Sequence, residues 1–143
     1  MTAGHGCVLA FDFGLKHIGV AVGQTVTAGA SPLTTLPARG GRPDWPAVDA
    51  LVARWRPFRL LVGLPLNMDD TESDMSLRAR AFADSLAERA QVPVTMVDER
   101  LTSYAVRDLA SGEEAHAAAA VLIAESWLNA DSERDTGRLT ADS

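Results

Sequence analysis

The chain has 143 residues, a length that fits one domain. Hydrophobic residues make up 47% and charged residues 22%, which is close to the average of soluble globular proteins and excludes a chain disordered throughout. Thirteen Lys and Arg against nineteen Asp and Glu give a formal net charge of -6. The surface as a whole therefore lacks the positive field of a bulk nucleic-acid binder, so a polyanion must be bound by local groups.

Cysteine content and hydropathy indicate the cellular compartment of the protein. Cys7 is the single cysteine, which excludes an intrachain disulfide and fits a reducing compartment. No apolar run approaches the roughly 20 residues of a membrane-spanning helix. We expect a cytoplasmic protein with no membrane partner.

The first third of the chain predicts three antiparallel strands. Apolar runs at 7–13 and 18–23 flank the short segment 14–17, a spacing typical of a β-hairpin. A third run at 28–36 contains Pro32, which a strand tolerates mainly at a sheet edge. Residues 40–43 predict a loop.

The rest of the chain predicts helices and strands in alternation. Asp44 can cap a helix that ends before Pro57, and a second helix over 76–90 would bury the apolar residues Leu77, Ala81, Phe82 and Leu86. The remaining elements are strands at 59–63 and 94–97, a polar loop at 67–74, and helices at 103–111 and 115–129. Residues 130–143 are mostly polar and predict a disordered tail after a domain of residues 1–129.

This order predicts an α/β fold with a mixed five-stranded sheet, in which three antiparallel strands precede alternating helices and strands and helices cover both faces. It is the element order of the ribonuclease H-like fold.

Asp12 is the first candidate for chemistry, because it lies inside an apolar strand. Burial of a carboxylate is costly unless the group is paired, hydrogen-bonded or bound to a cation. A divalent metal ion would stabilise it. The alternative is an ordinary Asp at a strand end that turns the hairpin.

Two further acids, Asp98 and Glu99, directly follow the predicted strand 94–97. Side chains at the carboxyl end of such a strand reach the crevice where ligands bind. Successive side chains point to opposite faces, so only one of the two acids can share a site with Asp12, and spacing does not decide which. The alternative is a solvated strand end that pairs with Arg100.

Three segments, 11–23, 62–69 and 97–102, resemble the signature blocks of the YqgF family, also called RuvX. The resemblance extends from about Cys7 to Leu128. It implies a ribonuclease H-like nuclease that matures the 5′ end of pre-16S ribosomal RNA, long described as a Holliday junction resolvase. It also implies that Asp12 is the first metal-binding carboxylate and that Glu99 or Asp98 is the second.

The last helix departs from the family pattern. Family members commonly have an Asp about nine residues before the Glu-Ser pair matched here by Glu125 and Ser126, and this chain has His116 there. An imidazole binds Mn²⁺ and later transition metals but is a poor ligand for Mg²⁺. The alternative is a surface histidine in the first turn of the helix. A second departure is Asp70, where the family usually has Gly.

The implied mechanism is phosphodiester hydrolysis with Mg²⁺ or Mn²⁺, which activates a water and stabilises the leaving oxygen. Cationic and amide side chains would bind the nucleic acid. These candidates are Lys16, Asn67, Arg78, Arg80, Arg100 and Arg107.

We therefore expect a metal-dependent nuclease of pre-16S rRNA in ribosomal particles, working as a monomer or weak homodimer. One alternative is a resolvase of four-way DNA, which would need a dimer with two active sites. A second is a nucleotide-binding protein, because the segment 12–19 also resembles the phosphate loop of actin-like kinases. A third is a catalytically weak RNA-binding assembly factor, suggested by His116.

Overall fold

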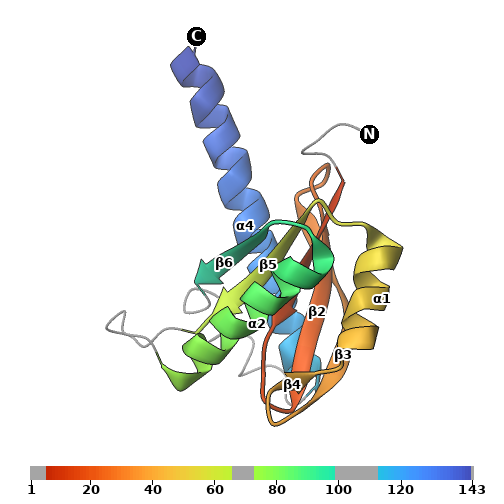
Figure 1. Ribbon diagram of the computed structural model, residues 1–143. Coiled ribbons are helices and arrows are strands. Elements are labelled where there is room, and N and C mark those ends of the chain that lie inside the picture. The colour runs from red at the N-terminus through yellow and green to blue at the C-terminus, as the bar shows by residue number, and fades with distance from the viewer. Residues whose placement is uncertain (1–5, 66–72, 99–112, 143) are drawn as a thin grey trace.

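The computed structural model describes residues 6–65, 73–98 and 113–142 (Figure 1). Its elements in chain order are β1 (Cys7–Asp12), β2 (His17–Gln24), β3 (Gly29–Arg39), β4 (Arg42–Pro43), α1 (Trp45–Trp55), β5 (Arg59–Leu64), α2 (Asp74–Ala90), β6 (Val94–Asp98) and α4 (Glu113–Asp142). The helix expected at 103–111 lies outside the described residues.

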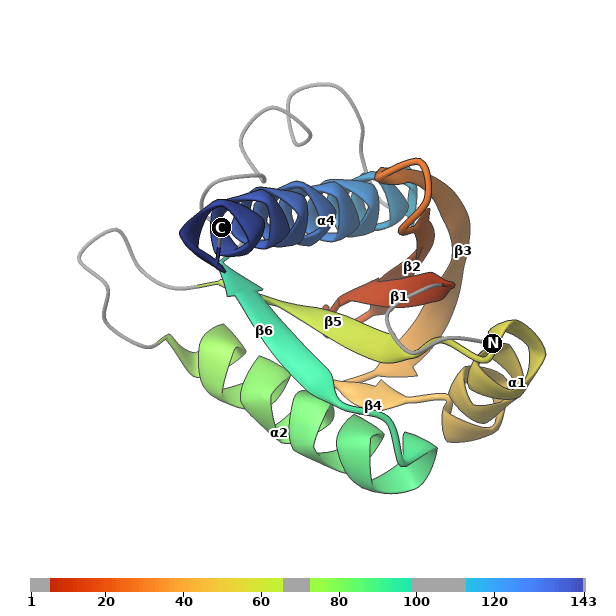
Figure 2. The same ribbon diagram turned by 90° about the horizontal axis from the view of Figure 1, so that it is seen from above.

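One mixed sheet, with strand order β4-β3-β2-β1-β5-β6, organises the molecule. The first four strands pair antiparallel, whereas β5 and β6 run parallel to β1. Helices α1 and α2 cover one face and α4 covers the other (Figure 2). The predicted α/β class, the antiparallel start and the helices on both faces are confirmed.

The prediction of five strands and of a loop at 40–43 is wrong. Gly40 and Gly41 adopt φ angles of 58° and 86°, a left-handed conformation that suits glycine and turns the chain back on itself. The two-residue strand β4 then pairs with the end of β3. Pro32 is accommodated in β3 by a register shift, since Val20 pairs with Thr34 and Ala21 with Pro32.

Helix α2 is rotated relative to the apolar face that the sequence predicted. Phe82 and Leu86 are buried as expected, but Leu77 is 55% exposed and Ala81 is also exposed. Leu77 lies five residues before Phe82, which places the two about 140° apart around the helix. The inner position near the N-terminus belongs to Ser76, whose hydroxyl completes a capping box with Ser73.

Helix α4 continues to Asp142, and the disordered tail expected from residue 130 stays a prediction. No proline follows residue 113, and helix formers such as Ala130, Glu133 and Arg134 extend the sequence. The limit of the domain at residue 129 stays a prediction. In the parts of the chain described above, no helix is both long enough and apolar enough to cross a membrane.

Helices α1 and α2 are joined at the surface by Arg89 and Asp49. The Arg89 guanidinium donates from Nη2 to Asp49 Oδ2 over 2.6 Å and lies 4.8 Å above the centre of the Trp45 ring. The hydrogen bond from Arg89 lowers the pKa of the Asp49 carboxyl. Since both side chains are exposed, solvent screens the pair and it contributes little to stability.

Small residues on β2 allow α4 to lie close to the sheet. A Cβ atom added to Gly19 would lie 2.1 Å from the carbonyl carbon and oxygen of His116, and one added to Gly23 would lie 2.9 Å from Leu128 Cδ1. Between them, Ala21 packs against the apolar side of α4. The backbone of α4 at His116 therefore rests directly on Gly19.

We expect Gly19→Ala to lower the free energy of unfolding by about 3 kcal/mol, because overpacked sites cost roughly 1–3 kcal/mol and here the obstacle is backbone. Urea denaturation measures the change. Gly29→Ala is the matched control, since the nearest atom to its added Cβ is Thr27 Oγ1 at 3.6 Å. Equal stability of Gly19→Ala and the parent protein would contradict the close contact.

Candidate functional site

Asp12 is the last residue of β1 and is 7% exposed. It pairs with Gly19 across the hairpin and follows Val8 and Ala10, whose side chains pack under α4. Because side chains alternate along a strand, Asp12 faces the same side of the sheet. A carboxylate is thus buried under the start of α4, where it needs a polar partner.

His116 supplies that partner. Its Nδ1 lies 2.7 Å from Asp12 Oδ2, and the ring is half-buried. Helix α4 holds the residue there by its backbone contact with Gly19. The interpretation of His116 as an ordinary surface residue therefore does not match the structure.

The His116 ring directs Nδ1 at Asp12, and its second nitrogen, Nε2, lies beside Gly14. With Nδ1 directed at Asp12, a proton on Nδ1 completes the hydrogen bond and Nε2 carries a lone pair whenever the ring is neutral. A Cβ atom added to Gly14 would lie 3.3 Å from Nε2, so glycine at this position keeps that side of the ring open.

A pocket of about 390 Å³ surrounds these groups. Its polar lining comprises Asp12, Lys16, His17 and His116, and Gly14 and Pro65 complete part of the wall. The rings of His17 and His116 lie 5.9 Å apart. Sequence reasoning did not include His17, although the hairpin register, which pairs Asp12 with Gly19, indicates that β2 begins beside the site.

Asp98 lies at the same edge of the sheet as Asp12, because β6 and β5 run parallel to β1. Its neighbour Val97 packs on the α4 side, whereas Val94 and Met96 pack on the side of α1 and α2. Alternation therefore assigns Asp98 to the face opposite Asp12. Glu99, Asn67, Arg100 and Arg107 lie outside the described residues.

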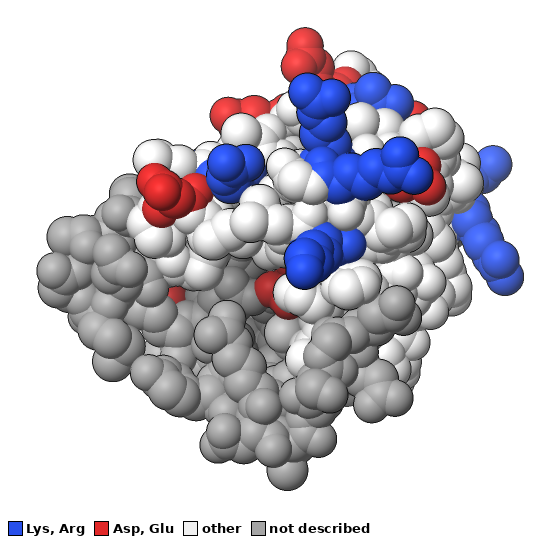
Figure 3. All heavy atoms as spheres, turned by 90° about the horizontal axis from the view of Figure 1, so that it is seen from below, with Lys and Arg blue, Asp and Glu red and all other residues white. Residues whose placement is uncertain are grey.

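The two arginines expected on α2 lie on different sides of that helix. Arg78 and Arg80 are both exposed, but residues two apart on a helix are about 200° apart and occupy opposite flanks. The Arg78 guanidinium lies beside the turn at Gly41, 3.3 Å from the position of an added Cβ. Figure 3 shows the molecule from below, where several Lys and Arg side chains lie on the surface with Asp and Glu side chains among them.

The described residues contain no group of three His, Cys, Asp or Glu side chains placed to hold a metal ion. They do bring together one carboxylate oxygen and one imidazole, from Asp12 and His116. Both are ligands of first-row divalent metals, and the carboxylate is also a ligand of Mg²⁺. The described part thus supplies a partial ligand set.

Comparison with known families identifies the chain. The family described as "RuvX: Holliday junction resolvase" matches residues 6–130, nearly the whole described domain. The chain belongs to the RuvX family. The resemblance carried by the three signature segments is confirmed, and with it the membership of a nuclease family.

Relatives of this RuvX chain are similar over most of their length. A protein of Marinobacter nauticus is 52% identical over 129 residues, which cover 84% of this chain and 90% of the relative. A protein of Saccharophagus degradans is 47% identical over 130 residues, or 84% and 91% of the two chains. Both carry the name "Putative pre-16S rRNA nuclease".

Solved structures support the fold of the RuvX chain. Thermus thermophilus RuvC in complex with a Holliday junction substrate superimposes with a TM-score of 0.61 at 19% identity, covering 90% of this chain and 96% of RuvC. A second structure of T. thermophilus RuvC gives a TM-score of 0.56 at 16% identity. The expected ribonuclease H-like fold is confirmed.

We expect the Nδ1 nitrogen of His116 to carry a proton in the metal-free protein, because its partner Asp12 Oδ2 is an acceptor. In Asp12→Asn the side-chain amide can donate instead, which permits the Nε2-protonated form. ¹⁵N-edited NMR of the imidazole distinguishes the two forms. Asp49→Asn, a change at a distant surface carboxylate, should leave the His116 signals unchanged, and an Nε2-protonated ring in the parent protein would contradict the assignment.

Proposed function

We propose that this RuvX-family chain is a metal-dependent nuclease that hydrolyses RNA and processes the 5′ end of pre-16S rRNA in cytoplasmic ribosomal particles. The observation that carries the proposal is the buried Asp12 carboxylate on the wall of an open pocket, against the His116 imidazole and near Lys16. The pre-16S rRNA nuclease names of the relatives support the choice of substrate.

Mg²⁺ or Mn²⁺ fits the donor atoms at this pocket. Asp12 provides a hard oxygen, and His116 provides a nitrogen that Mn²⁺ accepts more readily than Mg²⁺. Glu99 is proposed as a further ligand, in line with the resemblance to the family, and the alternation of side chains along β6 supports Glu99 over Asp98 as the second carboxylate. A bound divalent ion would lower the pKa of an attacking water and stabilise charge on the phosphate.

The protein's own groups position the substrate. Lys16 is exposed at the rim of the pocket, where its ammonium can contact a phosphate oxygen. His116, fixed through Nδ1 by Asp12, presents Nε2 beside Gly14 as a ligand or proton acceptor. Further contacts to the nucleic acid, on either side of the Asp12 pocket, are proposed for Asn67, Arg78, Arg80, Arg100 and Arg107.

Resolution of Holliday junctions is the second candidate, favoured by the superposition on RuvC bound to a junction. Paired cleavage of two strands needs two active sites in one assembly. Mass measurement in solution, with and without a four-way DNA, separates the two proposals. A monomer in both states supports the RNA nuclease, whereas a dimer that cleaves the junction symmetrically supports the resolvase.

The direct test of the nuclease is Asp12→Asn with a precursor RNA that contains the 5′ end of 16S rRNA. We expect cleavage to fall more than about 100-fold, since even outer-shell partners of a metal ligand cost roughly 10- to 100-fold. Folding should survive, because Asn removes a buried charge and can still hydrogen-bond His116. Equal cleavage by the parent and Asp12→Asn proteins would exclude Asp12 as the centre of the chemistry.

His116→Asp tests whether the imidazole determines the choice of metal. We expect Mg²⁺ to bind about tenfold more tightly to the variant, because a carboxylate adds negative charge and a hard oxygen. Calorimetry with Mg²⁺ and Mn²⁺ measures both affinities without RNA. An unchanged Mg²⁺ affinity would contradict a ligand role for His116, and a strong gain in Mg²⁺-dependent cleavage would show that the native site is tuned to another metal.

A further inference from the structure

A groove of about 430 Å³ lies between the β3–β4 turn and α2, on the side of the sheet away from α4. Its floor is made by Phe13, Trp45 and Phe82, and Arg42 and Arg78 stand on its walls. The Trp45 and Phe82 rings are stacked with centroids 5.5 Å apart, and Phe13 and Phe82 are only 7% and 4% exposed, so the floor is held rigidly by the core. We call this site, defined by these five residues, the arginine groove.

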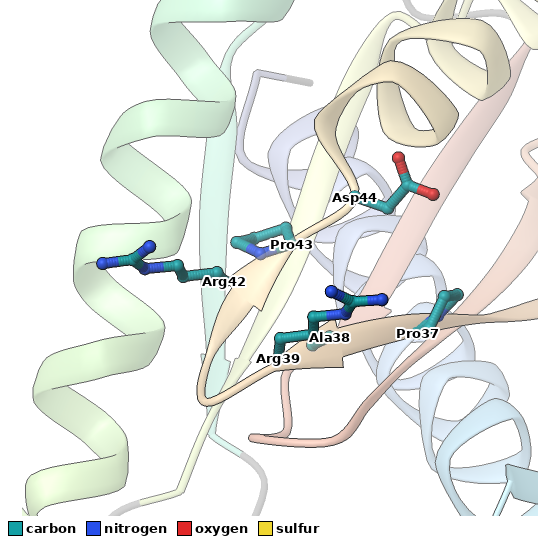
Figure 4. A pocket seen from close by; sticks show the side chains of 6 residues that line it. All are labelled: Pro37, Ala38, Arg39, Arg42, Pro43 and Asp44. Carbon is teal, nitrogen blue, oxygen red and sulfur yellow. The ribbon is translucent and has the colours of Figure 1, made fainter.

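Arg42 and Arg78 reach the arginine groove from separate elements. Arg42 extends from β4 toward α2 (Figure 4), and Arg78 lies on α2 against the backbone of Gly41. Both side chains are exposed, and the described residues give neither of them an ion-pair partner. Arg89 nearby differs, because it is neutralised by Asp49. Two guanidinium groups without a carboxylate partner among the described residues thus lie on one small site.

The charge around the arginine groove favours an anion there. None of the described residues that line it carries a carboxylate, although the chain as a whole has a net charge of -6. The neighbouring hollow on the other side of β4, which Arg39 and Arg42 line, also contains Asp44 (Figure 4). That carboxylate accepts a hydrogen bond from Ala47 N and caps α1. The arginine groove, on the α2 side of Arg42, is therefore more positively charged than the hollow that contains Asp44.

The arginine groove adjoins the Asp12 pocket. Phe13, the residue after Asp12, lines both hollows, and Leu15 lines the Asp12 pocket while its carbonyl accepts a hydrogen bond from Gly41 N over 3.0 Å. The segment 13–15 lies between the arginine groove and the Asp12 pocket. One polynucleotide strand can therefore occupy both.

We propose that the arginine groove binds an unpaired nucleotide of the RNA substrate, next to the phosphodiester bond held at Asp12. Arg42 and Arg78 hold its phosphate, because guanidinium groups bind phosphate oxygens in pairs of hydrogen bonds. The base lies against the apolar lining of the groove, to which Pro43, Trp45 and Ala81 contribute, since bases splayed out of single-stranded segments can contact apolar side chains. The proposal rests on the proposed RNA nuclease and adds that its substrate is single-stranded beside the cleavage site.

Binding in EDTA tests the arginine groove independently of cleavage. The probes are a fluorescent RNA duplex with a single-stranded 5′ extension and the same duplex with a blunt end, both followed by fluorescence anisotropy. We expect Arg42→Ala and Arg78→Ala each to weaken binding of the extended RNA about tenfold and to change binding of the blunt duplex less than twofold. Arg54→Ala, an exposed arginine on α1 outside the hollows described above, is the matched control.

Two further measurements distinguish a nucleotide site from general attraction. The double variant Arg42→Ala/Arg78→Ala should reduce the slope of log K against log salt by about 0.7, because the two arginines hold one phosphate and each phosphate contact on a single strand contributes about 0.7. Ala81→Glu places an acid at an exposed position on the wall of the arginine groove and should also weaken the extended RNA about tenfold. Ala50→Glu on α1 controls for the added charge.

The outcomes separate this proposal from the proposed nuclease. If the parent protein cleaves precursor RNA and the arginine variants bind both probes like the parent, the arginine groove is not a nucleotide site, whereas the nuclease stands. If the arginine variants bind the extended and the blunt RNA more weakly by the same factor, the proposal that the arginine groove recognises an unpaired nucleotide is also wrong. If extended RNA alone loses affinity but neither Mg²⁺ nor Mn²⁺ supports cleavage, the arginine groove stands and the nuclease fails.

Discussion

The contact between the backbone of α4 and Gly19 on β2 is the constraint on which the site depends. A side chain at Gly19 would meet the His116 carbonyl group at 2.1 Å, so only glycine lets the helix approach this closely. The approach fixes the height of His116 above the sheet and brings its ring to Asp12. Gly19 is also the pairing partner of Asp12, which means that one position sets both members of the pair.

Burial gives the Asp12–His116 pair its chemical character. A carboxylate at 7% exposure is stable only with a compensating group, and a half-buried imidazole is one such group here. A neutral imidazole compensates the charge only in part, which leaves the site able to attract a cation. The positive surface toward Arg42 and Arg78 lies beyond Phe13, so cation and polyanion are attracted to adjacent but separate places.

The sequence predicted the fold class, the hairpin and the burial of Asp12, because these depend on local patterns of apolar residues and on one charged residue inside an apolar strand. The predictions were wrong where strand pairing or helical phase decides the structure. The turn at Gly40 and Gly41 that creates β4 depends on strand pairing, and the exposure of Leu77 depends on the helical phase of α2. Spacing left Asp98 and Glu99 equivalent, and the alternation of β6 distinguishes Asp98, which faces away from Asp12.

A crystal structure of the protein grown with Mn²⁺, with anomalous scattering recorded, tests the central claim most directly. We predict an anomalous peak within coordination distance of the Asp12 carboxylate, with the His116 ring still held beside that carboxylate by the contact of α4 with Gly19. An imidazole turned away from Asp12, with no manganese at that carboxylate, would contradict it.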